Sequence, residues 1–159
     1  MAATETTAII DRLERFGRRN WASEPGDITR LRAHSLPPMG TMPPVLYANF
    51  NTFSMGENIQ VVRQLALEEA LPPEALNKMA AALLNRHAGR LAKWKLTNTV
   101  RLVRDLAAYF EAGGARSHDE VVQVCEAAMV AFDRINSWID AMIPWAHFDQ
   151  KVKLLDAAG

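Results

Sequence analysis

The residues with the most reactive side chains are few and far apart in this sequence. It contains one cysteine and four histidines: Cys125, His34, His87, His118 and His147. No histidine follows a Glu at the Glu-x-x-His spacing of a di-iron bundle, and one cysteine with scattered histidines cannot complete a zinc site. Gly113-Gly114 lacks the further glycines and the Lys-Ser/Thr pair of a phosphate-binding loop. We therefore expect no metal ion and no other cofactor.

Two places could still hold a catalytic or ligand-binding group. His87 and Trp94 are seven residues apart, which puts them on the same side of a helix. The stretch 145–149, WAHFD, combines two aromatic rings with a His-Asp pair, but no nucleophile accompanies it. One hypothesis is therefore an enzyme or ligand-binding bundle around His87, Trp94 and His147. Cys125 falls on an apolar helical stripe, where cysteine acts as a small hydrophobic residue.

Positive charge is concentrated in residues 86–104, RHAGRLAKWKLTNTVRLVR. This stretch has six Lys or Arg and no Asp or Glu, although the formal net charge of the chain is zero. On one continuous helix, five of these cations would fall within a sector of about 80° and form a stripe about 27 Å long: Arg86, Arg90, Lys93, Arg101 and Arg104. A bend at residues 97–99 would break the stripe but keep Arg101 and Arg104 together. Such a basic surface suits the phosphate backbone of RNA or DNA, with little sequence preference.

A stripe of opposite sign is expected on the last helix. Four acidic residues recur every seven positions and form a line about 31 Å long: Asp119, Glu126, Asp133 and Asp140. The whole chain is divided in the same way, because residues 1–104 carry 14 Lys and Arg against 9 Asp and Glu, whereas residues 105–159 carry 4 against 9. The two stripes are either solvated faces of amphipathic helices, or surfaces that meet within one molecule or between neighbouring copies.

Periodic apolar residues predict three helices in the first part of the chain. The first ends near Asn20 and buries Ile9, Leu13 and Phe16. The second begins at the capping-box pattern of residues 54–57, SMGE, and continues through Ile59, Val62 and Ala66. The third begins at Pro72-Pro73-Glu74 and places four apolar side chains inward: Leu76, Met79, Leu83 and Leu84.

Two more helices follow. A cap at Asn98 or Thr99 predicts a helix over residues 100–110, closed by Gly113-Gly114. The capping-box pattern of residues 117–120, SHDE, then opens a long helix that Pro144 ends. One apolar stripe runs along it: Val121, Val124, Cys125, Ala128, Phe132, Ile135, Ile139 and Met142.

No helix of normal length is expected between residues 21 and 56. Residues 36–53, LPPMGTMPPVLYANFNTF, contain two Pro-Pro pairs together with methionine and aromatic side chains. A connection this long is unusual in a compact domain. Its apolar residues predict either a docking arm or a segment that wraps its own bundle and completes the core: Met39, Met42, Tyr47, Phe50 and Phe53. We therefore predict an all-α bundle of four to five helices in one domain, with an N-terminal helix and extended arm (residues 1–56) and a bundle core (residues 57–159).

Composition restricts the functional classes. The chain has 159 residues, enough for one hydrophobic core, and no apolar run approaches the roughly 20 residues of a membrane span. A charged N-terminus and a single cysteine favour a reducing, cytoplasmic setting. Our main hypothesis is a non-enzymatic structural protein that forms homo-oligomers through the arm and the complementary stripes, with nucleic-acid backbone as a further partner. A small monomeric or dimeric adaptor that binds a protein partner through the arm is the alternative.

Overall fold

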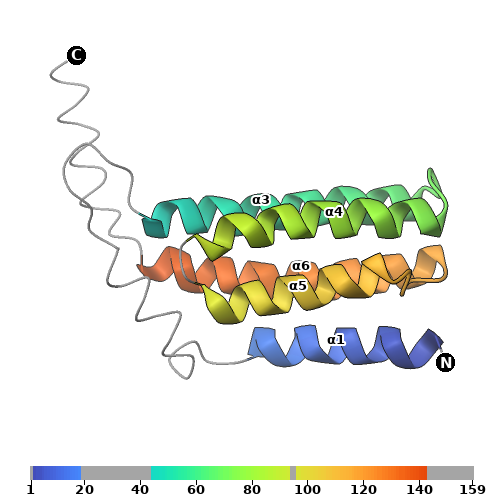
Figure 1. Cartoon of the computed structure of the whole chain (residues 1–159), viewed down its shortest axis with the longest axis horizontal. Helices are drawn as coiled ribbons and strands as arrows, with labels where there is room; N and C mark the ends of the chain where they lie inside the picture. Colours follow the sequence, from blue (N-terminus) through green and yellow to red (C-terminus); the bar gives the residue numbers. More distant parts are fainter. Residues whose placement is uncertain (1, 19–43, 94–95, 143–159) are drawn as a thin grey trace, which may run out of the picture.

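The computed structural model describes residues 2–18, 44–93 and 96–142. Every regular element in these ranges is an α-helix, and the helices lie side by side (Figure 1). Their bounds are as follows: α1 (Ala2–Arg18), α3 (Pro44–Leu67), α4 (Pro73–Ala92), α5 (Thr97–Glu111) and α6 (His118–Met142). The predicted all-α bundle is confirmed. Within the ranges that the structure describes, no helix is both long enough and apolar enough to cross a membrane.

Helices α3, α4, α5 and α6 form the bundle, and α1 covers one side of it. Helix α3 packs against both α6 and α4, and α4 packs against α5. Helix α1 lies along α6 and also touches α5. Helices α4 and α6 make few direct contacts, and Figure 1 shows α4 and α5 on the near side of the bundle, with α3 and α6 behind them. Their outer surfaces therefore point to opposite sides of the molecule.

The core is made by the apolar stripes that the sequence predicts. The buried apolar residues of all five helices form a single cluster. Its largest fully buried side chains are Phe110, Phe132, Leu13, Met55, Ile59, Leu76, Leu84, Leu91, Leu96, Leu102 and Leu106. At roughly 25 cal/mol for each Å² of apolar surface removed from water, this burial is the main force that holds the helices together.

Buried polar groups fix how the helices meet. Thr6 of α1 donates a hydrogen bond of 2.9 Å to the Glu120 carboxylate on α6 and lies 2.8 Å from the Tyr109 hydroxyl on α5. Because the Thr6 proton points to Glu120, the Tyr109 hydroxyl is the donor in the second bond. Asn77 of α4 donates to the Ala115 carbonyl at 2.7 Å and accepts a bond from the Ala115 N–H at 3.3 Å. These contacts tie α1 to α5 and α6, and α4 to the connection between α5 and α6.

The start of α3 corrects one prediction. The helix begins at Pro44, ten residues before the predicted start at Ser54, so residues 54–57 lie inside it and do not cap it. Pro44 is compatible with a first helical turn, where its missing N–H is not needed. The aromatic and polar residues that follow are weak helix formers, but packing overrides this preference. Thr52 and Met55 are both buried, and the Thr52 hydroxyl donates a 2.8 Å hydrogen bond to Asn136 of α6.

The other predicted helices are confirmed, but the predicted cap of α5 is wrong. The helix begins at Thr97 after the N-cap residue Leu96, so Asn98 and Thr99 lie inside its first turn. One side-chain placement also differs. The starts of α4, α5 and α6 and the ends of α1, α5 and α6 lie within a few residues of the predicted positions. The backbone N–H of Glu120 donates to Ser117 Oγ at 3.1 Å, as a capping residue requires. Gly113 adopts a positive φ of 70° after α5, which is the expected role of glycine at a helix end. Met79 was predicted to point inward, but it is exposed on the outer side of α4.

Candidate functional site

The five predicted basic residues are all exposed, and they lie on two helices. Arg86 and Arg90 lie in the last turns of α4 and Lys93 is its C-cap residue, whereas Arg101 and Arg104 lie in the first turns of α5. The chain reverses direction between the two helices, so the single straight stripe of a continuous helix does not form (Figure 1). The α4–α5 hairpin instead brings the two groups to the same end of the bundle. We call these five residues the basic surface.

No acidic side chain within the described residues neutralises the basic surface. None of its five members forms an ion pair or a hydrogen bond there. Asp105 is next to Arg104 in the sequence, but its carboxylate contacts the Arg12 guanidinium of α1 at 2.7 Å. Within the described residues, the positive charge of this end of the hairpin is therefore exposed and has no ion-pair partner.

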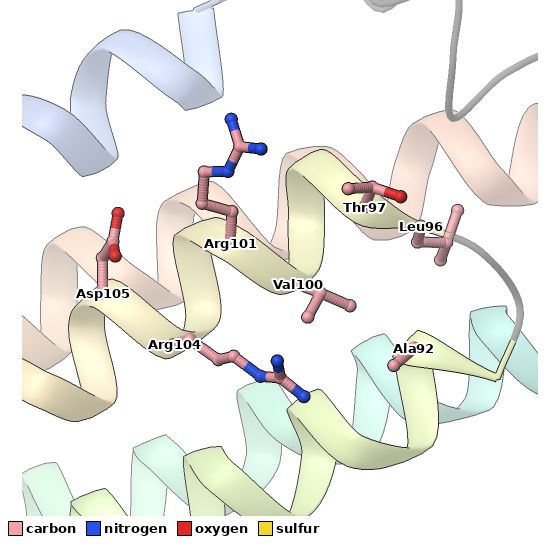
Figure 2. Close-up of a pocket in the computed structure, with 7 residues that line it drawn as sticks. All are labelled: Ala92, Leu96, Thr97, Val100, Arg101, Arg104 and Asp105. Carbon is pink, nitrogen blue, oxygen red and sulfur yellow. The ribbon is translucent and has the colours of Figure 1, made fainter.

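A shallow groove of about 430 Å³ lies where α5 begins, beside the end of α4. Its lining residues are Ala92, Leu96, Thr97, Val100, Arg101, Arg104 and Asp105. Figure 2 shows that the two arginines leave the groove in different directions, Arg101 toward α1 and Arg104 toward α4. Their guanidinium groups do not converge on one point. The groove is therefore not built as a clamp for a single small anion.

The four predicted acidic residues are exposed along α6, but one of them is neutralised within the subunit. Glu126 accepts two 3.0 Å contacts from the Arg63 guanidinium of α3. Asp119, Asp133 and Asp140 have no ion-pair partner among the described residues. We call these three carboxylates together with Glu126 the acidic surface. The pairing of Glu126 with Arg63 had no signal in the sequence, because it depends on how α3 lies against α6.

Beside the acidic surface runs a groove that the sequence did not reveal. It has a volume of about 400 Å³ and lies between α3 and α6. Asp133 and Glu57 contribute its charges, and Phe53 and Val130 contribute apolar surface. Phe53 is 56% exposed and Val130 is 65% exposed, so both leave apolar surface uncovered. This α3–α6 groove thus combines negative charge with uncovered apolar surface.

The basic and acidic surfaces do not meet within one molecule. They are carried by the α4–α5 hairpin and by α6, whose outer sides point in opposite directions. No ion pair joins a member of one surface to a member of the other in the described parts of the chain. Of the interpretations that the sequence leaves open, three therefore remain: solvated faces, contact between copies, and contact of the basic surface with a nucleic-acid backbone.

The predicted docking arm lies only partly within the described residues. Phe50 and Phe53 are exposed side chains on the first turns of α3, so they belong to a helix and not to an extended arm. Tyr47 is also within α3. Met39 and Met42 lie outside the described residues.

The predicted ligand-binding cluster is represented by His87 alone, because Trp94 and His147 lie outside the described residues. His87 is 1% exposed and lines none of the grooves described here. The Asn58 amide donates to its Nε2 at 3.0 Å, whereas its buried Nδ1 has no partner within the described residues. Burial, and then the charges of Arg90 and Arg86, lower the pKa of His87. These conditions favour the neutral ring.

Cys125 is fully buried on the inner side of α6, as the sequence predicts. Burial raises the pKa of its thiol to about 12. The described residues contain no group of three or more His, Cys, Asp or Glu that could hold a metal ion.

No family model, curated protein or solved structure matches this chain.

Proposed function

We propose that this protein is a non-enzymatic structural subunit that self-associates, with the basic surface of one copy against the acidic surface of the next. The observation that supports the proposal is that exposed charges of opposite sign lie on opposite sides of the bundle, and that all of them except Glu126 lack an ion-pair partner among the described residues. A contact between two different surfaces is heterologous. Repetition of such a contact gives a closed ring or an open filament, depending on the rotation between neighbours.

Charge alone would give a weak contact. An exposed ion pair contributes only about 0–1 kcal/mol and is screened by salt. The α3–α6 groove supplies the missing apolar component, because Phe53 and Val130 lie beside Asp133. The aliphatic stems of arginine side chains can cover apolar surface while their charged ends reach a carboxylate. We therefore place the acidic side of the contact at this groove.

Light scattering after size-exclusion chromatography, at low and at high salt, tests the proposal. We expect particles larger than one subunit at low salt, and smaller ones at high salt because the contact is screened. Asp133→Lys should abolish association at low salt. Glu111→Lys makes the same change of charge at an exposed position near the end of α5 and serves as the matched control. A monomer at every salt concentration would contradict the proposal.

The exposed aromatic residues of α3 favour one alternative. Phe50 and Phe53 are each about half exposed, and aromatic side chains dominate the energy of protein interfaces. A small adaptor that binds a protein partner through these residues would remain a monomer or dimer at every ionic strength. Replacing both phenylalanines by Ser would then abolish partner binding without changing particle size.

In either function we place the protein in a reducing, cytoplasmic setting, in keeping with its single buried cysteine.

A further inference from the structure

We propose that the basic surface also binds the phosphate backbone of nucleic acid without sequence preference. The first support is the absence of an ion-pair partner for its charges among the described residues. Five cations lie at one end of the α4–α5 hairpin, and none of them has an ion-pair partner within the described residues. Asp105, the acidic residue that lines the same groove, is engaged by Arg12. A polyanion therefore meets attraction there without first having to break an internal salt bridge.

The direction of the side chains distinguishes a polymer from a small anion. Arg101 and Arg104 extend toward opposite sides of their groove, so they cannot grip one phosphate between them (Figure 2). They can each contact a different phosphate of one chain. Arg86, Arg90 and Lys93 extend the charge by about 10 Å along α4, a length that corresponds to roughly three nucleotides of one strand. The geometry points to an extended backbone as the ligand.

The surroundings of the cations explain why base sequence would not matter. The floor of the groove is formed by small and aliphatic side chains, chiefly Ala92, Leu96 and Val100. Among the described residues, the lining includes no aromatic ring that could stack on a base and no carboxamide that could pair with a base edge. Phosphate contacts alone position a protein on nucleic acid but do not read the sequence.

This inference does not depend on self-association. The same five cations would be used in both contacts, so nucleic acid and a neighbouring copy would compete for them. Binding of one partner should weaken binding of the other, because the two cannot occupy the same guanidinium groups together. Failure of either proposal can therefore be recognised separately, by particle size in one case and by oligonucleotide binding in the other.

Fluorescence anisotropy of labelled single-stranded DNA, about 20 nucleotides long and in two unrelated sequences, tests the inference directly. Release of counterions from five phosphates predicts a slope of about −3.5 for log affinity against log salt concentration. The affinity should then fall roughly 100-fold between about 50 and 200 mM salt, equally for both sequences. A labelled polyglutamate of similar length serves as the competing acidic polypeptide and should bind more weakly than either DNA.

Variants identify the surface. Arg101→Gln with Arg104→Gln should reduce the slope by about 1.4 and weaken binding to both sequences alike. Arg90→Gln on α4 should reduce it by about 0.7 and provides an independent second variant. Lys78→Gln and Arg116→Gln remove exposed cations at the other end of the hairpin and should leave binding unchanged. Absence of DNA binding at low salt, an unchanged slope in both arginine variants, or preference for polyglutamate would overturn the inference.

Discussion

The side-chain amide of Asn58 on α3 donates a 3.0 Å hydrogen bond to Nε2 of His87 on α4. An amide nitrogen can only donate, so Nε2 is the acceptor and the ring proton resides on Nδ1. Protonation of the ring would convert this acceptor into a second donor. The α3–α4 contact is therefore built around a neutral histidine.

We predict that stability falls in mild acid because of this histidine. The folded protein lowers the pKa of His87 below 6.5, so the unfolded chain takes up the proton first as the pH falls. The contribution of His87 is complete above about pH 6.5 and decreases below it, by at most about 1.4 kcal/mol for each pH unit. Urea unfolding across this range measures the effect. His87→Gln keeps an acceptor for Asn58 but does not titrate, so its stability should depend less on pH; identical profiles would refute the prediction.

We predict that the hydrogen bonds of Thr6 stabilise the packing of α1 against the bundle. Thr6 is 4% exposed. Thr6→Ala removes its hydroxyl and leaves the Tyr109 hydroxyl without its acceptor. The expected loss is about 1–3 kcal/mol in the free energy of unfolding. Thr6→Ser keeps both hydrogen bonds and should lose much less. Equal losses in the two variants would mean that the methyl group, and not the hydroxyl, is important.

Replacing Gly114 and Gly89 by alanine should change the stability of the protein in opposite directions. A Cβ atom on Gly114 would lie 2.7 Å from the carbonyl oxygen of Tyr109 and would also overlap the Tyr109 ring. Gly89 lies inside α4 and has open space at the same point. We expect Gly114→Ala to lose about 1–3 kcal/mol of stability through overpacking. Gly89→Ala should gain about 0.5–1 kcal/mol through helix propensity. Thermal unfolding of both variants checks the signs, and a stable Gly114→Ala would contradict the close approach.

Cys125 is predicted to be unreactive in the folded protein. Its thiol is buried and has a pKa of about 12, so almost no thiolate is present near neutral pH. A colourimetric thiol reagent should react within the time of mixing in concentrated urea, but in native buffer only at the rate of unfolding. Rapid labelling of the native protein would show that α6 opens easily around this residue.

Charge-reversed variants should associate only when they are mixed. Arg90→Glu with Arg101→Glu reverses part of the basic surface, whereas Asp133→Lys with Asp140→Lys reverses part of the acidic surface. Each variant alone should remain a monomer. An equimolar mixture should form larger species by light scattering, because the unchanged acidic surface of the first can meet the unchanged basic surface of the second. A mixture that stays monomeric would contradict contact between these two surfaces.

The sequence by itself determined the class of fold and most of the helices. Apolar residues at 3.6-residue spacing can be buried only as helical stripes, and Gly113 and Ser117 mark helix ends through local backbone chemistry. Such signals are contained within a few turns of chain, so they can be read without the rest of the molecule. The charge of residues 86–104 was equally visible.

The tertiary structure decided where a helix begins when local signals conflict. It also decided which helices are neighbours and which charged side chains form pairs. Helix α3 extends back to Pro44 because Thr52 and Met55 are buried against other helices, which outweighs weak propensity. Whether a charged side chain has an ion-pair partner also depends on residues that are far away in the sequence. Arg63 neutralises Glu126 and Arg12 engages Asp105, yet each pair joins helices that are far apart in sequence. The placement of the basic and acidic surfaces on opposite sides likewise follows from packing, because a linear pattern carries no information about which helices become neighbours.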